Sequence, residues 1–197
     1  MGHQFIAVAP YGLQENMELN QLMTKLKRTM SGRRQEVRWT PPNLWHITVH
    51  FLGTLTSEQG RRVQGLLEAW NPGVEGLRLR LQGLGAFPDP AHARVLWLGV
   101  QENQEFLRLQ RDLGKILAAE GFPPESRDYR PHLTLARFRN SIAVGKLLEL
   151  GGRKYFGDYD VGEILLFESV LQGNILKYMP RYRKDLQGGA RDFNSAQ

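Results

Sequence analysis

Apolar residues along this chain recur with two different periods, and the two patterns follow one another in a regular order. Runs that are apolar at alternate positions, or nearly throughout, predict strands at residues 4–10, 46–52, 76–84, 94–100, 131–138 and 160–171. Segments with helical spacing of apolar residues predict helices at residues 13–30, 57–70, 106–119 and 143–150. Ser57 is a suitable N-cap residue for the second of these helices. The pattern therefore predicts a protein of mixed strands and helices.

The order strand, helix, strand, helix, strand occurs twice, in residues of about 4–85 and of about 94–172. We interpret this as a weak internal duplication. The expected fold is α+β: a single domain over residues 1–186 with two pseudo-symmetric lobes, each an antiparallel-rich sheet with helices on its outer face, flanking a central groove. The loop at residues 85–93 is expected to connect the lobes, and the polar residues 187–197 are expected to form a flexible tail.

The middle strand of each half contains a histidine and a threonine two residues apart. These are His46 and Thr48 in "HITV", and His132 and Thr134 in "HLTL". Residues i and i+2 of a strand point to the same face, so each histidine shares a face with its threonine, and Arg130 joins the second pair by the same parity. If a two-fold axis relates the lobes, the two polar faces look at each other across the groove.

Two imidazoles, two hydroxyls and a guanidinium suit acid–base chemistry on a phosphate. Histidine has a reference pKa near 6.5, so at neutral pH one imidazole of a pair can accept a proton while the other donates one. Hydroxyl and guanidinium groups bind the non-bridging oxygens of a phosphate. Two histidines on opposite sides of a phosphorus suit an in-line displacement, for which we expect neither a metal nor another cofactor.

These residues also have other interpretations. A single histidine–threonine pair in a strand is usually structural, and only its repetition favours function. A metal shared by His46 and His50 is excluded on a strand, because residues four apart are separated by roughly 13 Å; His50 is expected to end the strand or to lie at the rim of the groove. The chain lacks a phosphate-binding P-loop motif, a G-x-S-x-G elbow and any cysteine.

Composition and charge narrow the class of protein and of partner. The chain has 197 residues, of which 41% are hydrophobic, and no apolar run approaches the roughly 18 residues of a membrane helix, so we expect a cytoplasmic protein that does not bind membranes. The net charge of +6 and the pI near 9.8 favour an anionic partner, with nucleic acid first. Alternatively, the arginine excess reflects genome composition alone. Candidate phosphate contacts are Arg127, Arg137, Arg139 and the basic residues of 25–38 and 177–184; candidate stacking residues, with core burial as the alternative, are Trp39, Phe87, Tyr129 and Phe138.

The segments "RWTPPNLWHITVHFLG", "AFPDPAHARVLWLGV", "YRPHLTLARF" and "FESVLQGNILKYMPRYRKDL" resemble the RNA 2′,3′-cyclic phosphodiesterases, also called 2′-5′ RNA ligases, of the 2H phosphoesterase superfamily. The resemblance extends from Phe5 to about Leu186. It implies metal-independent hydrolysis of RNA 2′,3′-cyclic phosphate ends to 2′-phosphates, with His46 as general acid and His132 as general base. Phosphate binding would fall to both motif threonines, and to Arg130 by strand parity. His50 departs from the family, which often has lysine or another polar residue there.

Two alternatives stay open on the sequence alone. The same histidines could join a 2′,3′-cyclic end to a 5′-hydroxyl, giving a 2′-5′ linkage, so ligation and hydrolysis are not separated. A non-catalytic RNA-binding module is the other alternative, although both motifs are intact. We expect a monomer, because the duplication supplies within one chain the symmetry that a dimer would otherwise provide.

Overall fold

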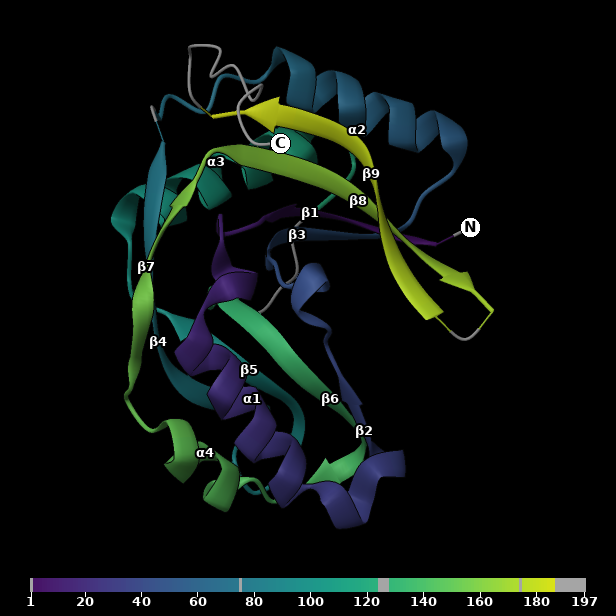
Figure 1. The fold of residues 1–197 in the computed structure, drawn as a ribbon. Coiled ribbons are helices and arrows are strands. Elements are labelled where there is room, and N and C mark those ends of the chain that lie inside the picture. The colour runs from purple at the N-terminus through teal and green to yellow at the C-terminus, as the bar shows by residue number, and fades with distance from the viewer. Residues whose placement is uncertain (1, 75, 124–127, 174, 187–197) are drawn as a thin grey trace, which may run out of the picture.

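The computed structural model describes residues 2–74, 76–123, 128–173 and 175–186 (Figure 1). Its strands are β1 (His3–Val8), β2 (Val37–Trp39), β3 (Ile47–Thr54), β4 (Leu77–Phe87), β5 (Ala93–Val100), β6 (His132–Ile142), β7 (Tyr155–Val161), β8 (Glu163–Gln172) and β9 (Ile175–Asp185). Its α-helices are α1 (Met17–Thr29), α2 (Ser57–Ala69), α3 (Gln104–Ala119) and α4 (Gly145–Gly151), and short 3₁₀ turns cover Leu13–Glu15, Ser31–Glu36 and Pro42–Leu44. The predicted tail and Arg127 lie outside the described residues.

The described strands form one antiparallel sheet with β3 and β6 as its central pair. The strand order is β7-β4-β5-β6-β3-β1-β8-β9, and β2 pairs with β6 outside this path. Three strands therefore follow β6 on one side and three follow β3 on the other. The sheet is strongly curled, so its two ends turn towards each other (Figure 1). This arrangement has the approximate two-fold character that the duplicated pattern predicts.

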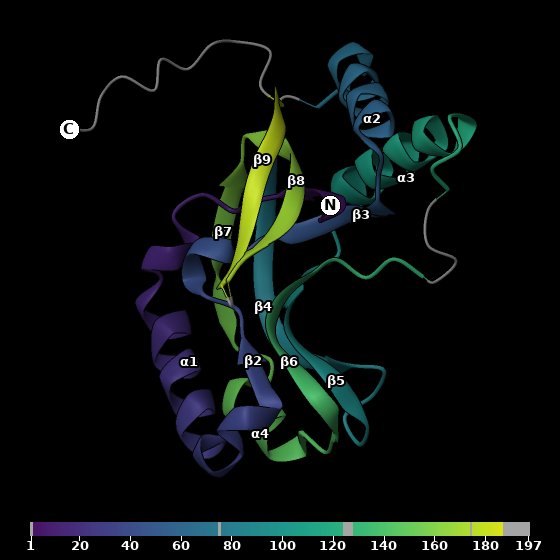
Figure 2. The same cartoon turned by 90° about the vertical axis from the view of Figure 1, so that its right-hand side faces the viewer.

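The helices lie in two pairs, one at each end of the molecule. In the described residues α2 contacts α3, α3 contacts β3 and α2 contacts β9, whereas α1 contacts α4, which contacts β4. Figures 1 and 2 show α2 and α3 beside the part of the sheet with β1, β3, β8 and β9, and α1 and α4 beside the part with β2, β4, β5 and β6. The predicted α+β fold with two lobes is confirmed. None of the described helices is long and apolar enough to cross a membrane.

Each lobe combines strands from both halves of the sequence. β4, at the end of the first half, pairs with β5 and β7, and β8, at the end of the second half, pairs with β1. Residues 88–92 therefore join two neighbouring strands of one lobe, and the prediction that the loop at 85–93 connects the lobes is wrong. The reason is that the third strand of each half crosses to the other lobe, and local periodicity does not reveal a pairing partner.

Three further boundaries differ from the predicted elements. The predicted strand at 160–171 is divided at Gly162 between β7 and β8, and β9 was not predicted because basic residues interrupt its apolar pattern. Helix α2 has Thr56 rather than Ser57 as its N-cap. The Thr56 hydroxyl accepts from the Gln59 backbone N–H at 3.2 Å, and the Gln59 side chain accepts from the Thr56 N–H at 2.9 Å. This reciprocal capping box satisfies two N–H groups that the first helical turn leaves free.

Candidate active site

The two histidine–threonine motifs meet where β3 and β6 pair. Ile47 and Leu133, the middle residues of the motifs, are antiparallel backbone partners. Both of these side chains are fully buried. Because successive strand residues point to opposite faces, the flanking residues of both motifs point to the other face, which we call the motif face. The apolar residues thus anchor each strand in the core while the polar residues remain half-buried.

The four polar residues of the motifs form a square on the motif face. In antiparallel register, the residues next to the Ile47–Leu133 pair also lie across from each other. His46 therefore lies across from Thr134, and Thr48 lies across from His132. The two histidines are then diagonal neighbours, which in a regular sheet lie about 7–8 Å apart. Each imidazole has a threonine of the other motif across from it.

Both imidazoles are held by the same local hydrogen bond. The Nδ1 atom of His46 lies 2.8 Å from the carbonyl oxygen of Leu44, and Nδ1 of His132 lies 2.7 Å from the carbonyl oxygen of Arg130. A carbonyl oxygen only accepts, so Nδ1 carries the hydrogen in each ring. Nε2 is therefore the nitrogen that gains and loses a proton. This is the tautomer that acid–base chemistry at Nε2 requires.

Aromatic side chains fix the orientation of both rings. His46 stacks on Phe5 of β1 with 4.9 Å between ring centroids, and the Tyr178 ring meets it edge-on at 5.1 Å. His132 meets Phe87 edge-on at 4.9 Å and lies 6.1 Å from the Trp97 ring of β5. Because β1 and β5 flank the central pair, each histidine is supported by an aromatic residue from the neighbouring strand. The two rings thus have related packing on either side of the central strand pair.

Burial and positive charge lower the pKa of both imidazoles in the free protein. Burial lowers the pKa of His46 to about 4, although the hydrogen bond to Leu44 opposes it; the charges of Arg137 and His132 lower it further. The pKa of His132 is also lowered, chiefly by burial and then by Arg137, against the hydrogen bond to Arg130. The two histidines are close enough for the charge of one to affect the other. An anion between them would reverse these effects, because negative charge favours the protonated rings.

A bulge in β6 brings Arg137 to the motif face. Consecutive residues of β5 pair with Ala136 and Thr134, so Leu135 is an additional residue in β6. Leu135 and Ala136 are both fully buried, and the alternation of faces shifts by one residue after them. Arg137 therefore follows Thr134 on the motif face, where simple alternation would place Ala136. Its charge acts on both catalytic candidates, as their lowered pKa values show.

The structure gives Arg130 a different place from the one that strand parity predicts. Arg130 precedes β6, is exposed, and contacts the site through its backbone carbonyl. The guanidinium that acts on the two histidines belongs to Arg137 instead. Sequence reasoning named Arg137 only as a candidate contact for RNA backbone phosphates. A bulge leaves no periodic signal in a short strand, so parity could not have found Arg137.

His50 lies in the core and is not part of the site. A matching bulge at Val49 of β3, where Ile6 and Ala7 of β1 pair with His50 and Thr48, turns the imidazole away from the motif face. Only 5% of His50 is exposed, and its Nε2 lies 2.8 Å from the Gln110 carbonyl oxygen of α3. The prediction that His50 ends the strand or lies at the rim is therefore wrong. The described residues contain no cluster of three histidine or acidic side chains that could hold a metal ion.

The four candidate stacking aromatics differ in their burial and contacts. Phe138 is buried in the core, and Trp39 packs against it while half-buried. The Tyr129 hydroxyl donates to the Thr48 carbonyl oxygen at 2.8 Å, which ties the segment before the second motif to the strand of the first. Phe87 contacts the ring of His132 edge-on. Burial, the alternative to stacking on RNA, is confirmed for Phe138.

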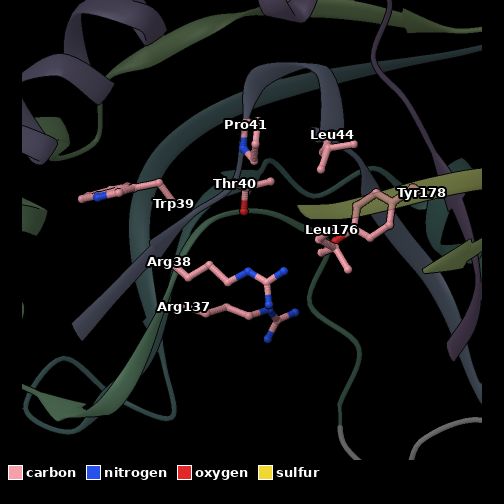
Figure 3. Close-up of a pocket in the computed structure, with 8 residues that line it drawn as sticks. All are labelled: Arg38, Trp39, Thr40, Pro41, Leu44, Arg137, Leu176 and Tyr178. Carbon is pink, nitrogen blue, oxygen red and sulfur yellow. The ribbon is translucent and has the colours of Figure 1, made fainter. Parts of the chain in front are cut away.

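A pocket of about 290 Å³ adjoins this square of residues. Its walls come from β2 and the turn that follows, from β6 and from β9 (Figure 3). The lining residues are Arg38, Trp39, Thr40, Pro41, Leu44, Arg137, Leu176 and Tyr178. The site therefore has two parts: the histidine–threonine square and a neighbouring pocket that contains two arginines.

Comparison with known proteins shows the family of this chain. The model of a family described as the 2′-5′ RNA ligase superfamily matches residues 18–169. The chain belongs to the 2′-5′ RNA ligase superfamily. Among related members, the RNA 2′,3′-cyclic phosphodiesterase of Methanothermobacter thermautotrophicus is 33% identical over 152 residues, covering 76% of this chain and 82% of that protein. The protein of the same name from Aeropyrum pernix is 38% identical over 143 residues, covering 68% and 78%.

Solved structures share the fold of this superfamily member. E. coli LigT complexed with 3′-AMP matches with a TM-score of 0.69 and 21% identity, over 94% of this chain and 98% of LigT. TT0787 of Thermus thermophilus matches with a TM-score of 0.69 and 24% identity, over 95% and 100% of the two chains. These structural matches support the curled two-lobed architecture.

Proposed function

We propose that this superfamily member hydrolyses 2′,3′-cyclic phosphate ends of RNA and leaves a 2′-phosphate. The observation that carries the proposal is the diagonal pair of imidazoles, each with Nδ1 bound to a backbone carbonyl and Nε2 left to exchange a proton. The names of the relatives from M. thermautotrophicus and A. pernix support the same reaction. The net charge of +6 supports an RNA substrate, because positive charge attracts the phosphate backbone.

In the proposed mechanism the cyclic phosphate lies between the two rings. Nε2 of His132 removes a proton from a water molecule as its oxygen bonds to phosphorus. The bond from phosphorus to the 3′ oxygen breaks, and Nε2 of His46 gives that oxygen its proton. The motif threonines and Arg137 bind the non-bridging oxygens and stabilise their growing negative charge. Ring strain in the substrate leaves positioning and charge stabilisation as the main tasks of the protein.

The general acid is charged by the substrate itself in this mechanism. With a pKa of about 4, His46 is almost entirely neutral at pH 7 in the free protein. A bound phosphate anion places negative charge next to the ring and raises its pKa. His46 therefore takes up a proton as the substrate binds, and the site acquires its acid only when a substrate is present.

The test is turnover of a short RNA with a 2′,3′-cyclic phosphate end by the wild-type protein and by His46→Ala and His132→Ala. Each substitution should reduce kcat by about 10²–10⁴-fold, the usual contribution of a general acid or base. His92→Ala, which changes an exposed loop histidine, should retain full activity. A wild-type protein that binds the RNA without turning it over would indicate the binding-module alternative. Adding an RNA with a 5′-hydroxyl tests ligation, which would appear as a joined product.

A further inference from the structure

The pocket beside the square contains two arginines in direct opposition. Arg38 of β2 and Arg137 of β6 are antiparallel backbone partners. The residues on either side of Arg137, Ala136 and Phe138, are buried in the core, so Arg137 points to the motif face. Figure 3 shows the guanidinium groups of both arginines next to each other in the pocket. Two positive charges are thus concentrated at one point beside the catalytic candidates.

Such a pair is unfavourable unless an anion lies between its members. Like charges directly opposite each other on neighbouring strands destabilise a sheet. Among the described residues, none places a carboxylate within ion-pair distance of Arg38 or Arg137, although Arg80, Arg181 and several other arginines have such partners. The fold thus leaves a doubly positive site without an internal counter-charge. Guanidinium groups in this arrangement bind phosphate oxygens well, because each offers several N–H donors in one plane.

The remaining walls suit the sugar and base that carry a phosphate. Pro41, Leu44 and Leu176 give the pocket apolar surface, and Thr40 points its hydroxyl towards the arginines (Figure 3). Tyr178 is close enough for both arginines to lower the pKa of its phenol, although burial, the larger effect, raises it. The volume of about 290 Å³ lies near the lower end for small-molecule sites. It therefore accommodates one phosphate and part of a nucleoside.

The pocket lies on the His46 side of the reacting phosphate. Leu44, which lines the pocket, accepts the hydrogen bond from His46 Nδ1, and Tyr178, which also lines it, meets the His46 ring edge-on. In the proposed mechanism His46 protonates the 3′ oxygen. On ribose the 3′ oxygen is bonded to C3′, whose neighbour C4′ carries the 5′ carbon and its oxygen. The 2′ oxygen is bonded to C2′, whose neighbour C1′ carries the base. The 5′ side of the terminal nucleotide is thereby directed to this pocket.

We propose that the Arg38–Arg137 pocket binds the phosphate on the 5′ side of the terminal nucleotide. The inference rests on the proposed function and specifies its substrate class: an RNA strand, or a nucleotide with a 5′-phosphate, in preference to a nucleoside 2′,3′-cyclic phosphate. Arg137 contacts both phosphates from its place between them, and Arg38 contacts only the second. The pocket thus distinguishes the end of a nucleic acid from a free cyclic nucleotide.

The experiment compares adenosine 2′,3′-cyclic phosphate with the same compound carrying a 5′-phosphate, at constant ionic strength. The measured quantity is the ratio of the two kcat/KM values. The wild-type ratio should be about ten or more, equivalent to about 1.4 kcal/mol. In Arg38→Gln the ratio should fall to about one or two. Arg34→Gln, which removes an exposed charge four residues earlier and outside the pocket, should keep the wild-type ratio.

Each outcome assigns success or failure to one of the two proposals. Turnover of both compounds with a ratio near one overturns the pocket proposal and leaves the proposed function intact, as does an Arg38→Gln protein with the wild-type ratio. An equal fall of the ratio in Arg34→Gln and Arg38→Gln also overturns the pocket proposal, because general attraction between positive charge and the 5′-phosphate would then explain the preference. If neither compound nor the short RNA is turned over, the proposed function fails. Calorimetric binding of adenosine 2′,5′-bisphosphate and adenosine 2′-monophosphate then tests the pocket alone, with at least tenfold tighter binding of the bisphosphate expected and equal binding contradicting it.

Discussion

Ile47 and Leu133 are backbone partners at the junction of β3 and β6, and this single pairing sets the geometry of the whole site. Both side chains are fully buried, so the register cannot slip by one residue without exposing them and burying the histidines. The same pairing makes His46 and His132 diagonal neighbours. The core therefore positions both imidazoles, which are the two proton-transfer groups of the proposed mechanism.

The pH dependence should differ between the free and the substrate-bound protein. Because kcat/KM reports the free protein, in which burial lowers both histidine pKa values below 6.5, its optimum should lie below pH 6.5. Between pH 6.5 and 8 the value of kcat/KM should fall, since the protonated acid becomes scarcer. The optimum of kcat should lie at higher pH, because the bound anion raises both pKa values. Rates measured from pH 4.5 to 8.5 check this; a flat kcat/KM profile would contradict paired acid–base catalysis.

Arg137 and Arg130 should differ sharply in their importance. Arg137→Gln removes the charge that acts on both histidines and should lower kcat/KM by at least tenfold, because phosphate oxygens lose a charged donor. The same substitution should raise the pKa of both imidazoles and shift the kcat/KM optimum to higher pH. Arg130→Gln keeps the backbone carbonyl that binds His132 and should change kcat/KM by less than threefold. Equal losses in the two variants would favour the strand-parity assignment of Arg130.

Two glycine-to-alanine substitutions should have opposite effects on stability: one lies where His50 packs against α3, and the other lies on α2 where the Cβ position is open. A Cβ atom on Gly114 would lie 2.9 Å from Cε1 of His50, so Gly114→Ala should destabilise the protein by about 1–3 kcal/mol. Gly65 in α2 has open space at its Cβ position, and Gly65→Ala should stabilise the protein by about 0.5–1 kcal/mol. Urea denaturation measures both free energies of unfolding. A stabilising Gly114→Ala would show that His50 is free to move and does not anchor the helix.

The strands that contain the two motifs can be predicted from the sequence, because they depend on local patterns of apolar and polar residues. "HITV" and "HLTL" contain the apolar alternation that buries Ile47 and Leu133, and their repetition indicates a paired site. The two bulges follow from pairing with β1 and β5, which no local pattern reports, so the positions of His50 and Arg137 could not be predicted. The crossing of β4 and β8 between lobes is equally non-local. The alternation of side chains between the two faces of a strand can therefore be counted from the sequence only as far as the first bulge.

The identity of the product from a short RNA with a 2′,3′-cyclic phosphate end tests the central claim most directly. If His132 activates water while His46 protonates the 3′ oxygen, hydrolysis in ¹⁸O-labelled water yields a 2′-phosphate alone, with one labelled oxygen on phosphorus. Phosphorus NMR and mass spectrometry distinguish this product from its isomer. A 3′-phosphate alone would contradict the roles proposed for the two histidines, and an equal mixture of both isomers would contradict a site in which they occupy fixed and opposite sides of one phosphate.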